Sequence, residues 1–137
     1  MGIDARVENE RGQLVAEVPD PRGLVNWLLA LVEPQQSTCL RFIDPYGHAV
    51  FNRIQIVELR KELEALRFRV TNQAVRAAKL KYLDSARNWP PKASAEAVRY
   101  TESLSTSELA EHLSKVVTLV EDAISKGPHY YVRFVGD

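Results

Sequence analysis

The sequence has little of what disulfide, metal and phosphate sites require. Its 137 residues include one cysteine, three histidines and six glycines. A single cysteine excludes an internal disulfide framework and a thiolate zinc cluster. The histidines have no H-x-x-x-H or H-x-E spacing, and the sequence contains no glycine-rich phosphate loop. We therefore expect no metal and no other cofactor.

Long apolar runs and an excess of either charge are also missing. The longest nearly apolar run, residues 23–32, is interrupted by Asn26 and is too short to span a bilayer. Residues 1–6 lack the apolar segment of a signal peptide. The 18 basic and 18 acidic residues balance, so no overall field favours nucleic acid or a membrane surface. The sequence predicts a soluble, cytoplasmic protein.

The composition that is present, 45% apolar and 26% charged, is that of an ordinary globular protein. We expect a single α+β domain over residues 1–137, with a small, mainly antiparallel sheet of about four strands and helices packed on one face. Residues 1–12 carry no predicted element, and we treat them as a candidate disordered segment. Residues 67–105 are expected to form a helical block.

Alternating apolar and polar residues predict the strands, and a turn motif predicts a hairpin. Asp44-Pro45-Tyr46-Gly47 has the residue types of a type I turn, with Gly47 expected to supply a left-handed residue. The segments before and after it should therefore pair as a β-hairpin. Leu40–Ile43 and Val132–Val135 share the pattern apolar, Arg, Phe, aliphatic, which suggests neighbouring strands. The predicted strands are residues 13–18, 38–43, 48–52 and 129–135.

Capping residues mark the predicted helices. Asp20-Pro21 is typical of a helix start, and Asn52 with Gln55 forms a capping box. The apolar spacing after Asn52 predicts either one kinked helix or two helices that separate near residues 70–72. A further helix is expected over residues 94–104. Ser105 should cap the last helix.

Cys39, His48 and Asp44 are the only candidates for nucleophilic catalysis. A working thiolate needs a base within hydrogen-bond reach. Cys39 and His48 fall at opposite ends of the predicted hairpin arms, and a free cysteine on a strand is usually a small core residue. We expect no catalytic residue. A small-molecule enzyme remains an alternative that would require a pocket near Arg41 and Tyr131.

Arginines in the middle of two predicted strands suggest a binding surface. Arg41 and Arg133 must either reach water or pair with a carboxylate, for which Glu17 is the candidate. In the alternative interpretation, the helix-free face of the sheet exposes them, and arginine and tyrosine commonly anchor protein interfaces. The predicted partner-binding residues are Arg41, Tyr46, His48, Tyr131 and Arg133.

A basic stripe offers a second surface. Arg69, Arg76 and Lys79 are spaced to share one helical face in a region where Asp84 is the sole acid. Such a stripe is usually a solvated helix face, but it is also compatible with binding to nucleic-acid phosphates. It lacks interleaved aromatic residues, which disfavours single-strand recognition.

Two segments carry a resemblance to known proteins. These are Phe42-Ile43-Asp44-Pro45-Tyr46-Gly47 with Phe51-Asn52, and Phe134-Val135-Gly136-Asp137. In these segments the chain resembles small bacterial proteins of unassigned function, some of them similar to immunity-type partners of secreted toxins. The resemblance implies a non-enzymatic module that binds another protein, such as a toxin that it occludes, and it assigns no functional residue.

Overall fold

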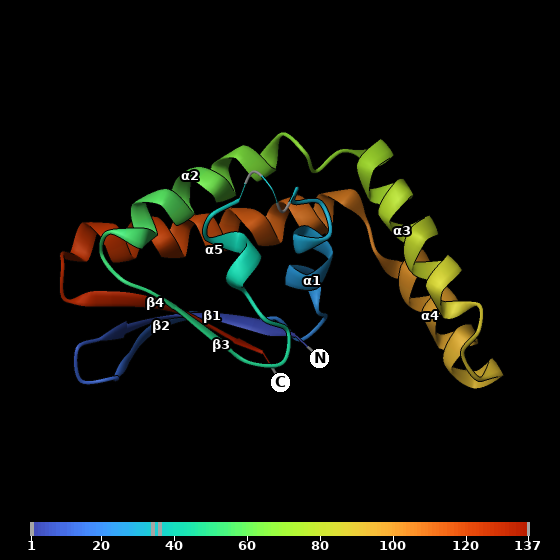
Figure 1. Cartoon of the computed structure of the whole chain (residues 1–137), viewed down its shortest axis with the longest axis horizontal. Helices are drawn as coiled ribbons and strands as arrows, with labels where there is room; N and C mark the ends of the chain where they lie inside the picture. The colour runs from blue at the N-terminus through green and yellow to red at the C-terminus, as the bar shows by residue number, and fades with distance from the viewer. Residues whose placement is uncertain (1, 34, 36, 137) are drawn as a thin grey trace.

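Four antiparallel strands form one sheet in the order β2-β1-β4-β3. The structure, a computed structural model, describes residues 2–33, 35 and 37–136. Helices α1, α2 and α5 lie on one face of the sheet, and within the described chain no helix covers the other face (Figure 1). The predicted α+β fold, with helices packed on one face of an antiparallel sheet, is confirmed. The elements are β1 (Ile3–Asn9), β2 (Leu14–Val18), α1 (Leu24–Leu29), the 3-10 helix η2 (Leu40–Phe42), β3 (His48–Phe51), α2 (Gln55–Arg67), α3 (Asn72–Ala86), α4 (Pro91–Ser103), α5 (Thr106–Lys126) and β4 (Tyr130–Gly136).

Strand β1 corrects the expectation of disorder over residues 1–12. It lies between β2 and β4 at the centre of the sheet. Ile3, Ala5 and Val7 are fully buried, and they alternate with charged residues that point to the opposite face. The expectation failed because half of the strand is charged and Ala5 contributes little hydrophobicity, although the period of two is present in the sequence.

The predicted β-hairpin around the turn at residues 44–47 is wrong. Leu40–Phe42 forms a 3-10 helix instead of a strand. The cause lies in α2, where the Glu62 carboxylate accepts hydrogen bonds from the backbone N–H groups of residues 38–40 at 3.0 to 3.2 Å. Backbone groups that are bound to a side chain are not available for a β ladder.

Strand β3 pairs with β4, at the far end of the sequence, instead of with residues 38–43. Ala49 faces Phe134, and Phe51 faces Val132. The neighbours of β4 are β1 and β3. The expectation that the similar segments Leu40–Ile43 and Val132–Val135 would be adjacent strands is therefore also wrong.

The turn itself forms as predicted, but its glycine has another role. The Gly47 N–H donates to the Asp44 carbonyl at 3.3 Å, and the Tyr46 N–H donates to Asp44 Oδ1 at 2.8 Å. Gly47 does not adopt a positive φ. Its carbonyl instead accepts the N–H of Gly136 at 2.8 Å, which fastens the turn to the end of β4.

Helix α1 begins later than predicted. Its first residue is Leu24, because Gly23 takes a left-handed φ of 70° after the predicted start at Asp20-Pro21. Asp20 nevertheless satisfies the helix start, since its carboxylate accepts the N–H groups of Leu24 at 2.7 Å and Val25 at 3.0 Å.

The capping predictions for the later helices are confirmed. Asn52 and Gln55 exchange side-chain-to-backbone hydrogen bonds at 3.1 and 3.0 Å. Two helices, α2 and α3, follow in place of one, and the Thr71 hydroxyl caps α3. Ser105 caps α5 through the N–H of Glu108. A helix over the predicted residues 94–104 is also present as α4, so residues 67–105 are largely helical.

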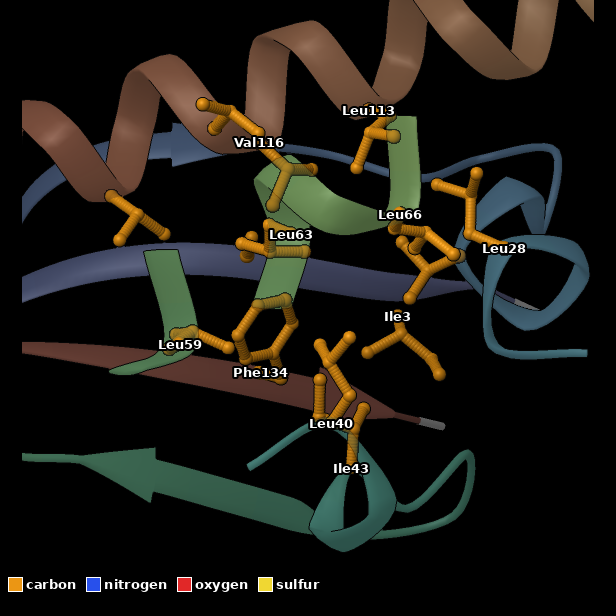
Figure 2. Packing of buried hydrophobic residues seen from close by; sticks show 14 of the residues in the cluster. Ile3, Leu28, Leu40, Ile43, Leu59, Leu63, Leu66, Leu113, Val116 and Phe134 are labelled. Atoms are coloured by element: carbon orange, nitrogen blue, oxygen red, sulfur yellow. The ribbon is translucent and has the colours of Figure 1, made fainter. Parts of the chain in front are cut away.

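The core lies between the sheet and helices α2 and α5 (Figure 2). Leu59 on α2 and Leu113 on α5 are fully buried, and Phe134 is 1% exposed. The rings of Phe51 and Phe134 meet edge to face, with centroids 6.0 Å apart. Each fully buried large apolar side chain contributes about 1.5–3 kcal/mol to folding.

Helices α3 and α4 form a hairpin that projects from the helical layer (Figure 1). An aromatic contact joins it to the body, because Trp27 on α1 meets Tyr82 on α3 with ring centroids 5.1 Å apart. Tyr100 on α4 reaches the same body, since its hydroxyl donates to the Arg22 carbonyl. The hairpin is thus tied to α1 on its inner side.

Candidate functional site

The helix-free face of the sheet brings together three of the five predicted partner-binding residues. Its members alternate along each strand with the side chains that are buried under the helices. We use the name helix-free face for the side chains of Asp4, Arg6 and Glu8 on β1, Glu17 on β2, His48 and Val50 on β3, and Tyr131, Arg133 and Val135 on β4.

Arg133 is the centre of this face. Its Nε donates to Glu8 Oε1 at 2.8 Å, and its Nη1 lies 3.3 Å from Nδ1 of His48. The guanidinium therefore links β1, β4 and β3. Tyr131 lies two residues earlier on β4, where it faces Glu8 across the ladder. The prediction that His48, Tyr131 and Arg133 share a face agrees with this geometry.

One row of side chains crosses the whole sheet. The strand registers place Val50 opposite Arg133, Arg133 opposite Arg6, and Arg6 opposite Glu17. The two arginines would repel each other as direct neighbours, but each has its own carboxylate. Arg6 pairs with Glu17 at 3.4 Å, and Arg133 pairs with Glu8.

Arg41 and Arg133 were expected either to form ion pairs across the sheet or to be exposed on its helix-free face, and each interpretation is partly correct. An ion-pair ladder does cross the sheet, but Glu17 pairs with Arg6 and not with Arg41 or Arg133. Sequence reasoning missed Arg6 and Glu8 because β1 itself was missed. The signal that would have found them is the alternation Ile3-Asp4-Ala5-Arg6-Val7-Glu8, which places all three charged side chains on one face.

Arg41 and Tyr46 do not belong to the helix-free face. Arg41 lies on η2 and not in a strand, and its guanidinium stacks over the ring of the neighbouring Phe42 at 4.8 Å. Tyr46 projects from the turn and is 75% exposed. The expectation of an arginine in the middle of a strand at residue 41 is wrong, because Glu62 holds that segment in a 3-10 turn.

The predicted basic stripe is divided between two places. Arg69 precedes α3 and forms an ion pair with Glu33 at 3.3 Å. Lys79 on α3 donates to the carbonyl oxygen of Leu104, so its ammonium group is bound to the C-terminal end of α4. Arg76 is exposed on α3. The three side chains thus do not present one continuous surface to phosphates.

The cysteine and the histidines lie apart from one another, so no thiol has an imidazole base beside it among the described residues. Cys39 is buried beside α2, with its thiol directed to the Gln55 carbonyl. His112 is buried on α5, and His129 pairs with Glu10 at the surface. Over the described ranges, no three His, Cys, Asp or Glu side chains are placed to hold a metal ion.

No helix in the described part of the chain has the length and hydropathy needed to cross a membrane. Comparison of the chain with known protein families, with curated proteins and with solved structures found no match.

Proposed function

We propose that the chain is a non-enzymatic protein-binding module and that the helix-free face of the sheet is its contact surface. The observation that carries the proposal is the row Val50, Arg133, Arg6 and Glu17, which runs in register over all four strands on a face that no described helix covers. Such a face combines charged and apolar side chains on the regular backbone of one sheet.

Fixed side chains favour association because less conformational entropy is lost when the partner binds. Glu8 and His48 hold Arg133, and Glu17 holds Arg6. Val50 is 44% exposed beside this network, so the face offers apolar area next to satisfied charges. Arginine and tyrosine in such settings are typical anchors of protein interfaces.

The chemistry-bearing residues support a binding role over catalysis. Burial raises the pKa of the Cys39 thiol above its ordinary value of 9.0, and the nearby Glu62 carboxylate raises it further, so the thiol stays protonated at neutral pH. His48 is in contact with a guanidinium instead of a nucleophile. An immunity-type role in the cytoplasm, in which the module occludes a toxin, is the specific form of the proposal that the sequence resemblance favours.

Recovery of the chain from its native host with untagged partners tests the proposal. The informative comparison is Val50→Asp on the helix-free face against Val57→Asp on α2, because the two valines are 44% and 45% exposed. We expect wild type and Val57→Asp to retain a stoichiometric partner that Val50→Asp loses. Thermal unfolding should show that all three proteins are folded. Equal retention by both variants, or recovery of a lone chain under every condition, would contradict the proposal.

A further inference from the structure

A cleft of about 770 Å³ lies between α1, the turn at residues 44–47 and the inner side of the α3–α4 hairpin. Its volume falls in the range of small-molecule sites, roughly 300–1,000 Å³. It shares no residue with the helix-free face, so an occupant of the cleft and a partner on the sheet would use different parts of the molecule.

One wall of the cleft is an aromatic cluster. Trp27 contacts Tyr82 edge to face at 5.1 Å and Tyr100 at 6.1 Å. Trp89, which does not line the cleft, meets Tyr82 edge to face with ring centroids 5.8 Å apart. Burial raises the pKa of Tyr100 above its ordinary value of 10.0, so the phenol keeps the proton that it donates to the Arg22 carbonyl. Trp27, Tyr82 and Tyr100 stand on α1, α3 and α4, and helices position binding side chains more precisely than loops do.

The side chain of Tyr46 lines the cleft from the turn. It is 75% exposed, an unusual exposure for a large aromatic side chain. The backbone beneath it is fixed, because Asp44 holds the Tyr46 N–H and the Gly47 carbonyl accepts the N–H of Gly136. Tyr46 is therefore an exposed aromatic side chain on a hydrogen-bonded turn, and a flat ligand in the cleft would cover it.

The charge of the cleft is positive. None of the described residues that line it is acidic, whereas Arg22 and Lys81 both line it. Arg22 is already paired with Glu108 at 2.9 Å. Lys81 forms no ion pair with any described residue, and the half-buried Asn26 makes no side-chain hydrogen bond among them. An anion would thus find one unbalanced ammonium group and one amide donor.

A carboxylate fits these donors better than a phosphate does. Phosphate sites usually present several backbone N–H groups at a helix start or a glycine-rich loop. Here the N–H groups of Leu24 and Val25 are bound to Asp20, and the N–H of Gly23 donates to the Asp20 carbonyl. The cleft therefore offers side-chain donors without a backbone cradle.

We propose that this cleft binds a small aromatic carboxylate. Its ring lies between Tyr46 and the wall formed by Trp27, Tyr82 and Tyr100, and its carboxylate is held by Lys81 and Asn26. Burial of the ring against aromatic side chains supplies affinity, and the ammonium group selects the charge.

Calorimetric titration of the full chain tests the site with phenylacetate and indole-3-acetate, each against its neutral amide. We expect both carboxylates to bind and the amides to bind at least about tenfold more weakly, a difference of about 1.4 kcal/mol. Lys81→Gln should remove this discrimination. Lys61→Gln, at an exposed position on α2, is the matched control and should leave it unchanged.

Tyr46→Ala separates ring recognition from charge recognition, because it should weaken both the acids and the amides at an exposed position that the fold does not need. Val50→Asp should bind the acids as wild type does, so a failure here is distinct from a failure of the sheet surface. Equal binding of acids and amides, no binding of either acid at millimolar concentration, or tighter binding of adenosine monophosphate than of both acids would each overturn the proposal.

Discussion

Oδ1 of Asp20 lies 3.9 Å from Nε2 of His112, and both side chains are buried. Asp20 also accepts the backbone N–H groups of Ile3, Leu24 and Val25, so one carboxylate joins β1 to α1. Nε2 of His112 has no hydrogen-bond partner among the described residues. The Asp20 carboxyl group, already hydrogen-bonded to three N–H groups, thus faces the His112 imidazole, and burial disfavours the protonated form of that imidazole.

We expect the free energy of unfolding to fall as the pH drops below about 6.5. Burial lowers the pKa of His112 below its ordinary value of 6.5, and Lys115 adds to this, although Asp20 and Glu108 oppose it. Because the unfolded chain then binds the proton more readily than the folded chain, stability is complete above 6.5 and decreases toward the folded pKa. Urea unfolding at about pH 7.5 and about pH 5.5 measures the difference.

His112→Gln removes the titrating group and should reduce that loss of stability at acid pH. His129→Gln is the control, because His129 is exposed and pairs with Glu10 at the surface. The same acid response in wild type and His112→Gln would exclude the buried imidazole as its source.

Glu62→Gln should lower the free energy of unfolding by about 1.5–3 kcal/mol. Its carboxylate accepts the hydroxyl groups of Ser37 and Thr38 as well as three backbone N–H groups. Burial alone raises the pKa of Glu62, but these hydrogen bonds outweigh it and hold the pKa below 4.5. The contribution is present above pH 4.5 and is lost as the pH falls toward the folded pKa.

The control for this change is Glu58→Gln, one turn earlier on α2 and exposed, which should alter stability by less than about 0.5 kcal/mol. Chemical denaturation of both variants measures the difference. Equal effects at the two positions would show that Glu62 does not anchor the segment before η2.

Gly136→Ala should destabilise the fold by about 1–3 kcal/mol. A Cβ atom at this position would lie 2.3 Å from the Pro45 carbonyl oxygen, so the turn would have to move away from β4. Hydrogen exchange should then report faster exchange of the residue 136 N–H, which now binds the Gly47 carbonyl. Unchanged stability with unchanged exchange would contradict the close approach of turn and strand.

The Cys39 thiol should react slowly with a disulfide reagent in the folded protein and rapidly in denaturant. The side chain is 5% exposed, and burial raises its pKa, so both access and thiolate population are low. The labelling rate with and without urea measures this. A folded-state rate close to the unfolded one would contradict the burial of Cys39.

Helix starts that carry a capping box were the most predictable part of the fold because their signals are local. Asn52 with Gln55 and Ser105 with Glu108 each place a capping side chain next to the backbone that it satisfies. The strands were less predictable, since pairing is decided by residues far away. No local pattern near residues 38–43 predicts that the Glu62 carboxylate will accept hydrogen bonds from N–H groups of this segment.

The candidate site was partly predictable for the same reason. Tyr131 and Arg133 alternate along a strand that the sequence identifies, so their common face follows from the period of two. Arg6 and Glu8 could be assigned to this face only if β1 had been predicted as a strand. The prediction for Arg41 assumed a strand at residues 38–43, which tertiary contacts prevent. The cleft beside Tyr46 requires the placement of the α3–α4 hairpin, which no local pattern specifies.

The pairing of β1 with β4 has a consequence for the order of folding. Glu8 and Arg133, which join these two central strands, are 125 residues apart in the chain. The central pairing of β1 with β4 therefore cannot form until β4 has been synthesised, even if the helices have already formed. Until then the edge of β1 that pairs with β4 has no partner strand, and an unpaired strand edge exposes the chain to aggregation.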